Sequence, residues 1–336
     1  MNKEPLLKVD NLKTHFNTAT GIVKAVDGVT FSLDSGQTLG IVGESGCGKS
    51  VTSSSIMRLL PKNGHIVEGS ILFEGKDIVK LSQKEMLQIR GNDISMIFQD
   101  PMTALDPVYT IGSQIMEVIN AHQKMSKAEA KEYAVKVLKM VGIPEAEKRL
   151  KSYPHEFSGG MRQRVIIAMA IACNPKLIIA DEPTTALDVT VQAQVLGLMK
   201  NLQKESNSSI ILVTHNLGVV WKMCDTVMVM YAGKTVEYAD VKMIYSDARH
   251  PYTWGLLKSM PKVTDDPNIP LASIPGTPPD LKLTGGSCNF HNRCKYCQEI
   301  CKNKCPEMKE VEPVHFVACH FSEEELVEME RRGGND

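Results

Sequence analysis

The sequence lacks long hydrophobic runs and lacks an excess of charge of either sign. Its longest apolar stretches, such as Val165–Cys173, fall well short of the roughly 18 residues that a membrane-spanning helix requires. The first residues, MNKEPLLKVDNL, have no continuous apolar core and no small-residue cleavage site, so we do not expect a signal peptide. Net charge is −1, which excludes the overall basic field of many nucleic-acid-binding proteins. We therefore expect a protein that stays in the cytosol unless a partner recruits it to a membrane.

Cysteines are present but unevenly placed. Of the nine, Cys47, Cys173 and Cys224 are scattered through the first two-thirds of the 336 residues. In a reducing compartment, a dense group of cysteines indicates a metal or iron–sulfur site more readily than disulfides. The other six form such a group: Cys288, Cys294, Cys297, Cys301, Cys305 and Cys319.

The hydrophobic pattern suggests an α/β organisation, in a chain long enough for a large domain and a smaller one. The first 35 residues alternate as strands do, and Thr38–Val42 is a short apolar run that ends in a glycine-rich loop. A helix is expected over Ser50–Leu60, stopped by Pro61. Residues from about 103 to 170 are mostly helical in pattern, with a capping box at Ser126 and Glu129 that opens a helix running to Val141.

The second half of the pattern begins with two compact apolar runs, Leu177–Ala180 and Ile210–Thr214. Each is typical of a strand buried on both faces of a parallel sheet. A hairpin is expected where Asp225–Tyr231 and Lys234–Tyr238 flank Ala232–Gly233. Periodicity then weakens, and we place a domain boundary at residues 240–250.

Gly43-Glu-Ser-Gly-Cys-Gly-Lys-Ser50 fits the phosphate-binding pattern G-x-x-x-x-G-K-S/T. It follows an expected strand and opens an expected helix, which a chance glycine-rich turn would not require. Backbone N–H groups and the helix N-terminus can then hold an anion, while Lys49 reaches the β- and γ-phosphates and Ser50 ligates magnesium. The residues expected to bind nucleotide here are Gly43, Ser45, Gly46, Cys47, Gly48, Lys49, Ser50 and Val51.

Two carboxylates end the apolar run Leu177–Ala180. Asp181 can hold magnesium, usually through water, and Glu182 is placed to polarise an attacking water. Taken alone, the pair could simply end a strand before Pro183. Beside a phosphate-binding loop, the same residues predict a hydrolytic site for a nucleoside triphosphate.

A second anion-binding helix start is expected at Ser158-Gly159-Gly160, ahead of a long apolar helix. By itself this run could be a serine N-cap followed by flexible glycines. One chain with two phosphate-binding helix starts suggests a composite site in which two protomers sandwich the nucleotide.

Across residues 5–245 the sequence resembles the ATPases of ABC transporters. Phe157-Ser-Gly-Gly-Met-Arg-Gln163 is similar to their signature motif, usually written LSGGQ, with Met161 in place of the usual glutamine. The resemblance implies an α/β fold: a P-loop ABC ATPase cassette over residues 1–245, with a mixed sheet, an antiparallel β subdomain and a helical subdomain at about 103–170. It also implies ATP and Mg²⁺ as ligands.

Further roles follow from the same resemblance. Gln99 matches the loop glutamine that senses magnesium, as a second ligand beside Ser50, and couples to the membrane partner. Ala186-Leu187-Asp188 matches the D-loop, and His215 matches the switch histidine that contacts the γ-phosphate. Phe16 is the candidate for stacking on adenine, with packing in the core as the alternative.

The end of the chain resembles one branch of this family more specifically. His250-Pro-Tyr-Thr-Trp-Gly-Leu-Leu257 is similar to the HPYT-x-x-LL element of dipeptide, oligopeptide and nickel importers, and Ile274–Pro279 resembles their IPG-x-P-P segment. Residues 246–325 are expected to form this extension, followed by a charged tail at 326–336.

In that branch the extension carries a set of four cysteines, matched here by Cys288, Cys294, Cys301 and, after His315, Cys319. The match implies a [4Fe–4S] cluster held by their thiolates. Cys297 and Cys305 depart from the pattern. Without the resemblance, Cys294-x2-Cys297 and Cys301-x3-Cys305 would suit a structural Zn²⁺ site, and free or disulfide-bonded cysteines remain the third interpretation.

The resemblance implies a subunit that hydrolyses ATP to import di- or oligopeptides from the cytoplasmic face of the membrane. Its expected partners are two separate permease subunits, a second ATPase subunit (a copy of itself or a paralogue) and, indirectly, an extracellular solute-binding protein; no nucleic-acid partner is expected. The alternatives are nickel import and a soluble ABC-type ATPase, such as those of iron–sulfur assembly. A cysteine module that acts as a sensor is compatible with transport.

Overall fold

The computed structural model describes residues 4–100, 104–185, 187–261 and 272–333. The chain forms two compact units. Unit 1 comprises Met1–Leu33, Leu39–Val79 and Val213–Asp336, and unit 2 comprises Asp34–Thr38 and Lys80–Leu212. Within the described ranges, no helix combines the length and the apolar character needed to cross a bilayer.

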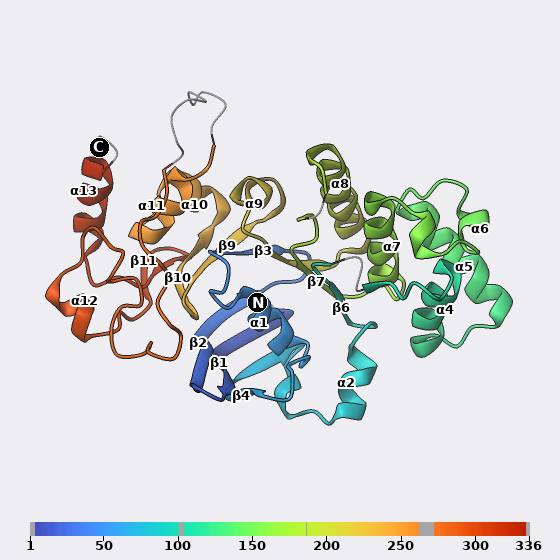
Figure 1. Ribbon diagram of the computed structural model, residues 1–336, viewed down its shortest axis with the longest axis horizontal. Coiled ribbons are helices and arrows are strands. Elements are labelled where there is room, and N and C mark those ends of the chain that lie inside the picture. Colours follow the sequence, from blue (N-terminus) through green and yellow to red (C-terminus); the bar gives the residue numbers. More distant parts are fainter. Residues whose placement is uncertain (1–3, 101–103, 186, 262–271, 334–336) are drawn as a thin grey trace. The chain divides into compact units, whose positions relative to one another are not determined.

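Unit 1 contains an antiparallel sheet with the strand order β2-β1-β4-β5. The strands are β1 (Leu7–Thr18), β2 (Gly21–Leu33), β4 (Gly64–Phe73) and β5 (Lys76–Asp77). The expected alternation is confirmed, because Leu7, Val9 and Leu12 are buried while Lys8 and Asp10 between them are exposed. Figure 1 shows this sheet in blue and cyan beneath the label α1.

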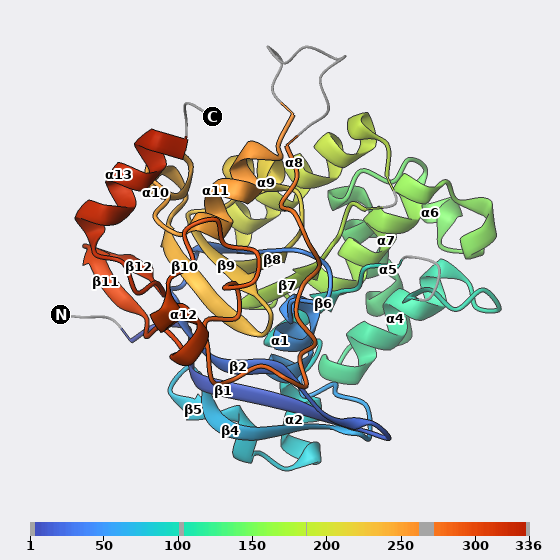
Figure 2. The same ribbon diagram turned by 60° about the vertical axis from the view of Figure 1, so that its left-hand side comes forward.

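A second group of strands in unit 1 carries the phosphate loop at one side and the extension at the other. Its order is β11-β12-β10-β9-β3, where β3 pairs parallel with β9 and the remaining neighbours are antiparallel. Figure 2 shows the extension strands β11 and β12 beside β10. The bounds are β3 (Thr38–Val42), β9 (Thr226–Tyr231), β10 (Lys234–Asp240), β11 (Lys309–Glu312) and β12 (His315–Val317).

The expected hairpin between β9 and β10 is confirmed. Ala232 and Gly233 take φ values of 45° and 84°, the paired left-handed conformation that matches the twist of the two strands. The helices of unit 1 are α1 (Lys49–Ile56), α9 (Leu217–Met223), α10 (Val241–Ser246), α11 (Pro251–Lys258), α12 (Glu299–Asn303) and α13 (Glu323–Gly333). Helix α1 ends earlier than the expected Leu60, because Arg58 takes a left-handed φ of 51° that a helix cannot continue.

The extension packs around a small hydrophobic cluster of its own. Ala248, Trp254, Val317, Phe321 and Leu326 form this cluster. The first two lie just before and within α11, and the other three lie between the end of β12 and α13. The tail expected from residue 326 therefore begins inside α13, whose Leu326 is 1% exposed.

Unit 2 combines three sheet strands in the order β8-β7-β6 with a group of helices. β6 (Ile94–Ile97) pairs parallel with β7 (Leu177–Asp181), and β8 (Ser209–Val213) is fully buried, as the compact apolar runs predict. The helices are α2 (Gln83–Ile89), α4 (Ile111–His122), α5 (Lys127–Met140), α6 (Ala146–Arg149), α7 (Gly159–Ile171) and α8 (Val189–Ser206). One 3-10 turn, Ile78–Lys80, lies where the chain passes from unit 1 to unit 2, and another, Pro154–Glu156, precedes α7.

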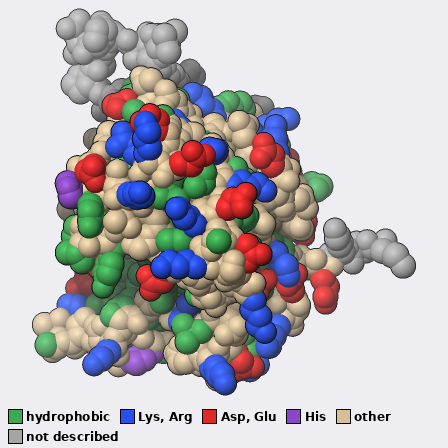
Figure 3. Space-filling model, turned by 90° about the vertical axis from the view of Figure 1, so that its right-hand side faces the viewer, with side chains coloured by type: hydrophobic (Ala, Val, Ile, Leu, Met, Phe, Trp, Pro, Cys, Tyr) green, Lys and Arg blue, Asp and Glu red, His purple; other side chains and the backbone are tan. Residues whose placement is uncertain are grey.

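The expected capping box at α5 is confirmed: Ser126 accepts from the Glu129 N–H, and the Glu129 carboxylate accepts from the Ser126 N–H. On the face seen in Figure 3, acidic and basic side chains of the described residues are interspersed rather than gathered into a field of one sign. This surface agrees with the near-zero net charge.

Candidate functional site

The phosphate loop Gly43–Ser50 joins β3 to α1 in unit 1. At two of its positions, backbone atoms of neighbouring strands leave no room for a side chain, so only glycine fits. A Cβ at Gly43, whose φ is 151°, would lie 2.2 Å from the carbonyl oxygen of Met230. A Cβ at Gly48, whose φ is 108°, would lie 2.3 Å from that of Ala25. Strands β9 and β2 therefore fix the course of the loop, and no side chain is tolerated at either position.

Lys49 lies buried within the curve of the loop. Its Nζ donates to the carbonyl oxygens of Gly43 (2.8 Å) and Glu44 (3.0 Å). No side chain caps the start of α1, where Gly48 is the N-cap. The loop therefore presents a lysine ammonium together with uncapped helical N–H groups, the combination that binds a phosphate.

The remaining loop residues differ in exposure. Ser45, Gly46 and Ser50 are exposed, and Val51 is half-buried on α1. Cys47 is buried, and this burial raises the pKa of its thiol above the ordinary value. Cys47 is therefore placed to shape the loop rather than to act as a thiolate.

Phe16 and His215 also belong to unit 1. Phe16 is half-buried on β1, opposite Val23 and Gly64, and its ring lies against Gly64. His215 is exposed and follows Thr214, whose N–H donates to the carbonyl of Ile41 at 3.1 Å. Because Ile41 lies on β3 two residues before Gly43, this bond ties the residue before His215 to the strand that leads into the phosphate loop.

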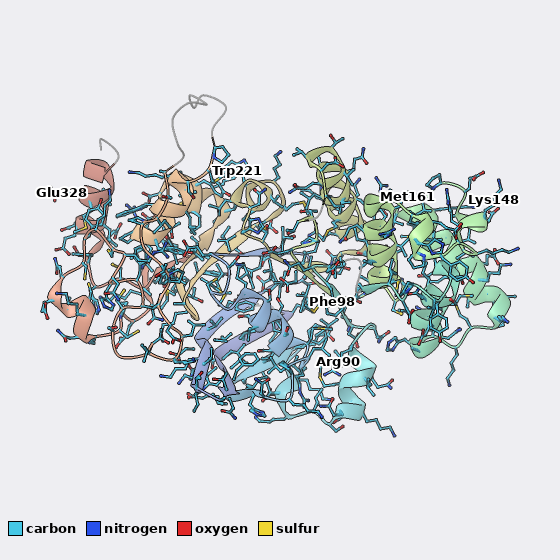
Figure 4. The ribbon with its side chains drawn as sticks, viewed as in Figure 1. Arg90, Phe98, Lys148, Met161, Trp221 and Glu328 are labelled. Atoms are coloured by element: carbon cyan, nitrogen blue, oxygen red, sulfur yellow. The ribbon has the colours of Figure 1, made fainter. Side chains whose placement is uncertain are left out.

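The carboxylates lie in unit 2. Asp181 is buried at the end of β7, and Glu182 follows with a left-handed φ of 46°. The Glu182 carboxylate accepts from Gln99 Nε2 at 3.1 Å and from Thr185 Oγ1 at 2.9 Å. Two residues expected at the site from distant stretches of sequence are thus in direct contact. Figure 4 labels Phe98, the exposed residue before Gln99.

The signature segment opens α7, also in unit 2. Ser158 is its N-cap and accepts from the Met161 N–H; Met161, on the first turn, is labelled in Figure 4. A Cβ at Gly160 would lie 2.5 Å from Val191 Cγ1 on α8, whereas a Cβ at Gly159 would have no atom within 4 Å. Packing within the chain thus explains the second glycine and leaves the first unexplained.

Asp188 caps the neighbouring helix α8. Its carboxylate accepts from the N–H groups of Thr190 (3.1 Å) and Val191 (2.9 Å). Ala186, the other end of the expected D-loop, lies outside the described residues.

Four cysteines of the extension line one small pocket in unit 1: Cys288, Cys294, Cys301 and Cys319. Burial, together with the charge of the neighbouring thiolates, raises the pKa of Cys288 and of Cys294 to about 12. All nine cysteines are free, and Cys297 and Cys305 do not line this pocket. Among the residues that the structure describes, no three His, Cys, Asp or Glu side chains are arranged to hold a metal ion.

One set of contacts to the phosphate loop was missed from the sequence. The Arg293 guanidinium binds the Glu44 carboxylate, and the Tyr252 hydroxyl accepts from the Glu44 N–H. Tyr252 belongs to the HPYT element, but Arg293 lies 249 residues from Glu44 and no local pattern marks it.

Comparison with protein families gives two matches along the chain. Residues 26–185 match the family described as "ABC transporter", and residues 236–301 match "Oligopeptide/dipeptide transporter, C-terminal region".

Similar proteins agree with both matches. The oligopeptide transport ATP-binding protein OppD of Bacillus subtilis is 56% identical over 313 residues, covering 93% of this chain and 87% of that protein. Its namesake from Salmonella typhimurium is 51% identical, covering 96% and 95%. The dipeptide transport ATP-binding protein DppD of Lactococcus lactis is 52% identical, covering 94% and 90%.

Solved structures give the same fold. The dimeric, post-hydrolysis ATP-binding cassette MJ0796 bound to ADP and Pi aligns with a TM-score of 0.63 and 27% identity, covering 70% of this chain and 98% of that one. The expected fold class is confirmed. The chain therefore belongs to the ABC transporter family, in the branch of ATP-binding proteins for oligopeptide and dipeptide transport.

Proposed function

We propose that this chain is the ATP-hydrolysing subunit of an importer for dipeptides or oligopeptides. The proposal depends mainly on one observation: unit 1 contains both a phosphate loop with its lysine buried in the curve and the extension that matches peptide transporters. The relatives described above are named for oligopeptide or dipeptide transport, which favours peptide over nickel and over a soluble iron–sulfur assembly ATPase.

Each candidate residue has a proposed role in hydrolysis. When ATP is bound, Lys49 would turn from the loop carbonyls to the β- and γ-phosphates, and Ser50 and Gln99 would hold Mg²⁺, with Asp181 acting through water. Glu182 takes the proton of the attacking water. Its contacts with Gln99 and Thr185 support this role, since they orient the carboxylate before substrate arrives. His215 contacts the γ-phosphate, and Phe16 stacks on adenine.

The site is completed by a second ATPase subunit, either a copy of this chain or a paralogue. Gly159 supports this proposal, because its surroundings in the chain leave room for a side chain and yet a glycine stands there. A phosphate that approaches the start of α7 from a partner's loop requires that room. Ser158, Gly160 and Asp188 would lie around the same nucleotide.

We propose that the cysteine pocket holds a [4Fe–4S] cluster. The four cysteines that line the pocket are the four of the expected pattern, and the two extra cysteines lie outside it. When bound, the cluster supplies covalent cross-links between segments; the protein supplies the thiolates, a buried pocket and the fixed backbone around Cys288 and Cys301.

Metal analysis of anaerobically purified protein tests the cluster. We expect iron and sulfide near four atoms each per chain, lost in Cys319→Ser and retained in the matched variant Cys297→Ser. Stoichiometric zinc without iron would refute the assignment.

The proposed partners are two permease subunits, and indirectly a solute-binding protein, with this chain on the cytoplasmic face of the membrane. An affinity tag on the full chain, followed by purification from solubilised membranes, tests this arrangement. Recovery of two multi-span permeases is the expected result. Recovery of a purely soluble complex would refute the transport assignment.

A further inference from the structure

The phosphate loop carries a negative side chain, Glu44, directly after Gly43. An uncompensated carboxylate at this position would repel the polyphosphate that the loop binds. The structure compensates it with Arg293: Nη1 lies 2.6 Å from Glu44 Oε2, and Nη2 lies 2.9 Å from Oε1. Such a two-point pair fixes the geometry of the carboxylate as well as its charge.

Besides Glu44, the Arg293 guanidinium has three further hydrogen-bond partners. Its Nε donates to the carbonyl of Pro275 (2.9 Å) and Nη2 to that of Ile274 (3.0 Å), both in the IPG segment. Nη1 also donates to Tyr231 Oη at 3.3 Å. The side chain is only 4% exposed, against 29% for that of Glu44. The guanidinium is therefore a preformed, buried counter-charge rather than a mobile surface group.

The backbone of Glu44 is held by the same extension. Its N–H donates to Tyr252 Oη at 2.9 Å. Tyr252 is fully buried, and its ring packs against Tyr231 and Phe290 with centroids 4.6 and 5.4 Å away. Side chain and peptide of Glu44 are thus fixed by residues that come more than 200 positions later.

The start of α11, which carries Tyr252, is anchored in turn. The buried Glu237 carboxylate on β10 accepts from the N–H groups of Arg249 and His250 and from His315 Nε2. This anchor makes the Tyr252 hydroxyl a fixed point for the loop.

We propose that Arg293 is a positioning residue for ATP binding, which neutralises and orients Glu44 so that the phosphate loop accepts a polyphosphate. Before nucleotide binds, Lys49 Nζ donates to the Glu44 carbonyl, so the position of the Glu44 peptide also sets where the phosphate-binding lysine starts from. The C-terminal extension thereby sets the affinity of the nucleotide site. The inference rests on the proposed ATP binding at this loop.

The test measures the Kd of a fluorescent ATP analogue with Mg²⁺ on the full chain, and the KM for ATP and kcat of the assembled transporter. For Arg293→Gln we expect Kd and KM to rise about tenfold with kcat within about twofold, the pattern of lost uniform binding. Glu44→Gln combined with Arg293→Gln should recover most of the loss, because the unpaired carboxylate is gone.

The matched control is Arg249→Gln. Arg249 is another buried arginine of the extension, paired with Asp247 and Glu312, and it does not contact the phosphate loop in the described structure. The substitution keeps the backbone N–H that donates to Glu237, so the anchor at the start of α11 is retained. It should reduce stability and leave the Kd for nucleotide within about twofold.

Three outcomes would overturn the inference: an unchanged Kd in Arg293→Gln, an equal loss in Arg249→Gln, or a double variant no better than the single one. If Arg293→Gln does not fold, Arg293→Lys decides, since it keeps the charge without the two-point pair. A rise of about three- to fivefold is then expected, and no rise refutes the role. Failure of the wild type to bind nucleotide would instead refute the proposed function.

Discussion

The two glycines of the signature segment should respond to alanine in opposite ways. Gly159 and Gly160 are neighbours at the start of α7, and neither takes a left-handed φ. A methyl group at 159 would meet no atom of the chain within 4 Å, whereas one at 160 would lie 2.5 Å from Val191 Cγ1. The difference separates the requirements of the fold from those of a bound partner.

The magnitudes follow from these contacts. Gly159→Ala should stabilise the isolated chain by a few tenths to about 1 kcal/mol, because alanine loses less backbone entropy than glycine in a helix. Gly160→Ala should destabilise it by about 1–3 kcal/mol, because α7 and α8 must move apart or Val191 must leave its rotamer. In the assembled transporter, Gly159→Ala should nevertheless lower ATP turnover at least about tenfold, since the methyl group would occupy the space that we propose for a phosphate bound by the partner subunit.

Urea denaturation of the isolated chain and phosphate release by the transporter measure the two effects. The Kd for ATP of the isolated chain serves as the internal control and should be unchanged in Gly159→Ala. Full turnover in Gly159→Ala would refute the composite site. A loss of stability in that variant would show that the space at 159 is required by the fold itself.

Three further outcomes are expected. Glu182→Gln should lower turnover at least about 100-fold while leaving the Kd for ATP within about twofold; undiminished phosphate release would exclude Glu182 as the base. Cys47 should be alkylated slowly at pH 8, because burial raises its thiol pKa and an ordinary thiol is only roughly a quarter thiolate there. The rate, followed on the Cys47 peptide by mass spectrometry, should rise with pH and fall with ATP, and a fast, pH-independent reaction would contradict the burial. Glu237→Ala should cost about 3–5 kcal/mol of unfolding free energy in urea, because it leaves His315 and two N–H groups unpaired; a stability equal to that of wild type would contradict this anchor.

Local chemistry made much of the fold predictable from the sequence. The phosphate loop, the capping box at Ser126 and the hairpin at Ala232–Gly233 are each specified by residues within a few positions of one another. The apolar runs of β7 and β8 likewise predicted strands buried on both faces. These features depend on spacing, which a sequence displays directly.

What the sequence did not predict depends on contacts between distant segments. Nothing near Arg293 marks it as the counter-charge of Glu44, and nothing near Gly160 shows that Val191 will pack against it. No pattern in the sequence predicts the left-handed backbone of Glu182 either. The many charged residues near the end of the sequence predicted a tail from residue 326. Leu326 and Met329 are nevertheless spaced three residues apart on one face of α13, and both pack in or against the hydrophobic cluster.

The long reach of the Glu44–Arg293 contact has a consequence for biosynthesis. At about 5–20 residues per second, a ribosome needs roughly 12–50 s to make the 249 positions that separate the two residues. Strand β9, whose backbone determines the course of the loop at Gly43, also emerges late. The phosphate loop is thus synthesised well before the segments that fix its conformation. A nascent chain that has not yet reached Arg293 would carry the complete phosphate-binding motif without the contacts that fix the loop, which would delay ATP use until those contacts form.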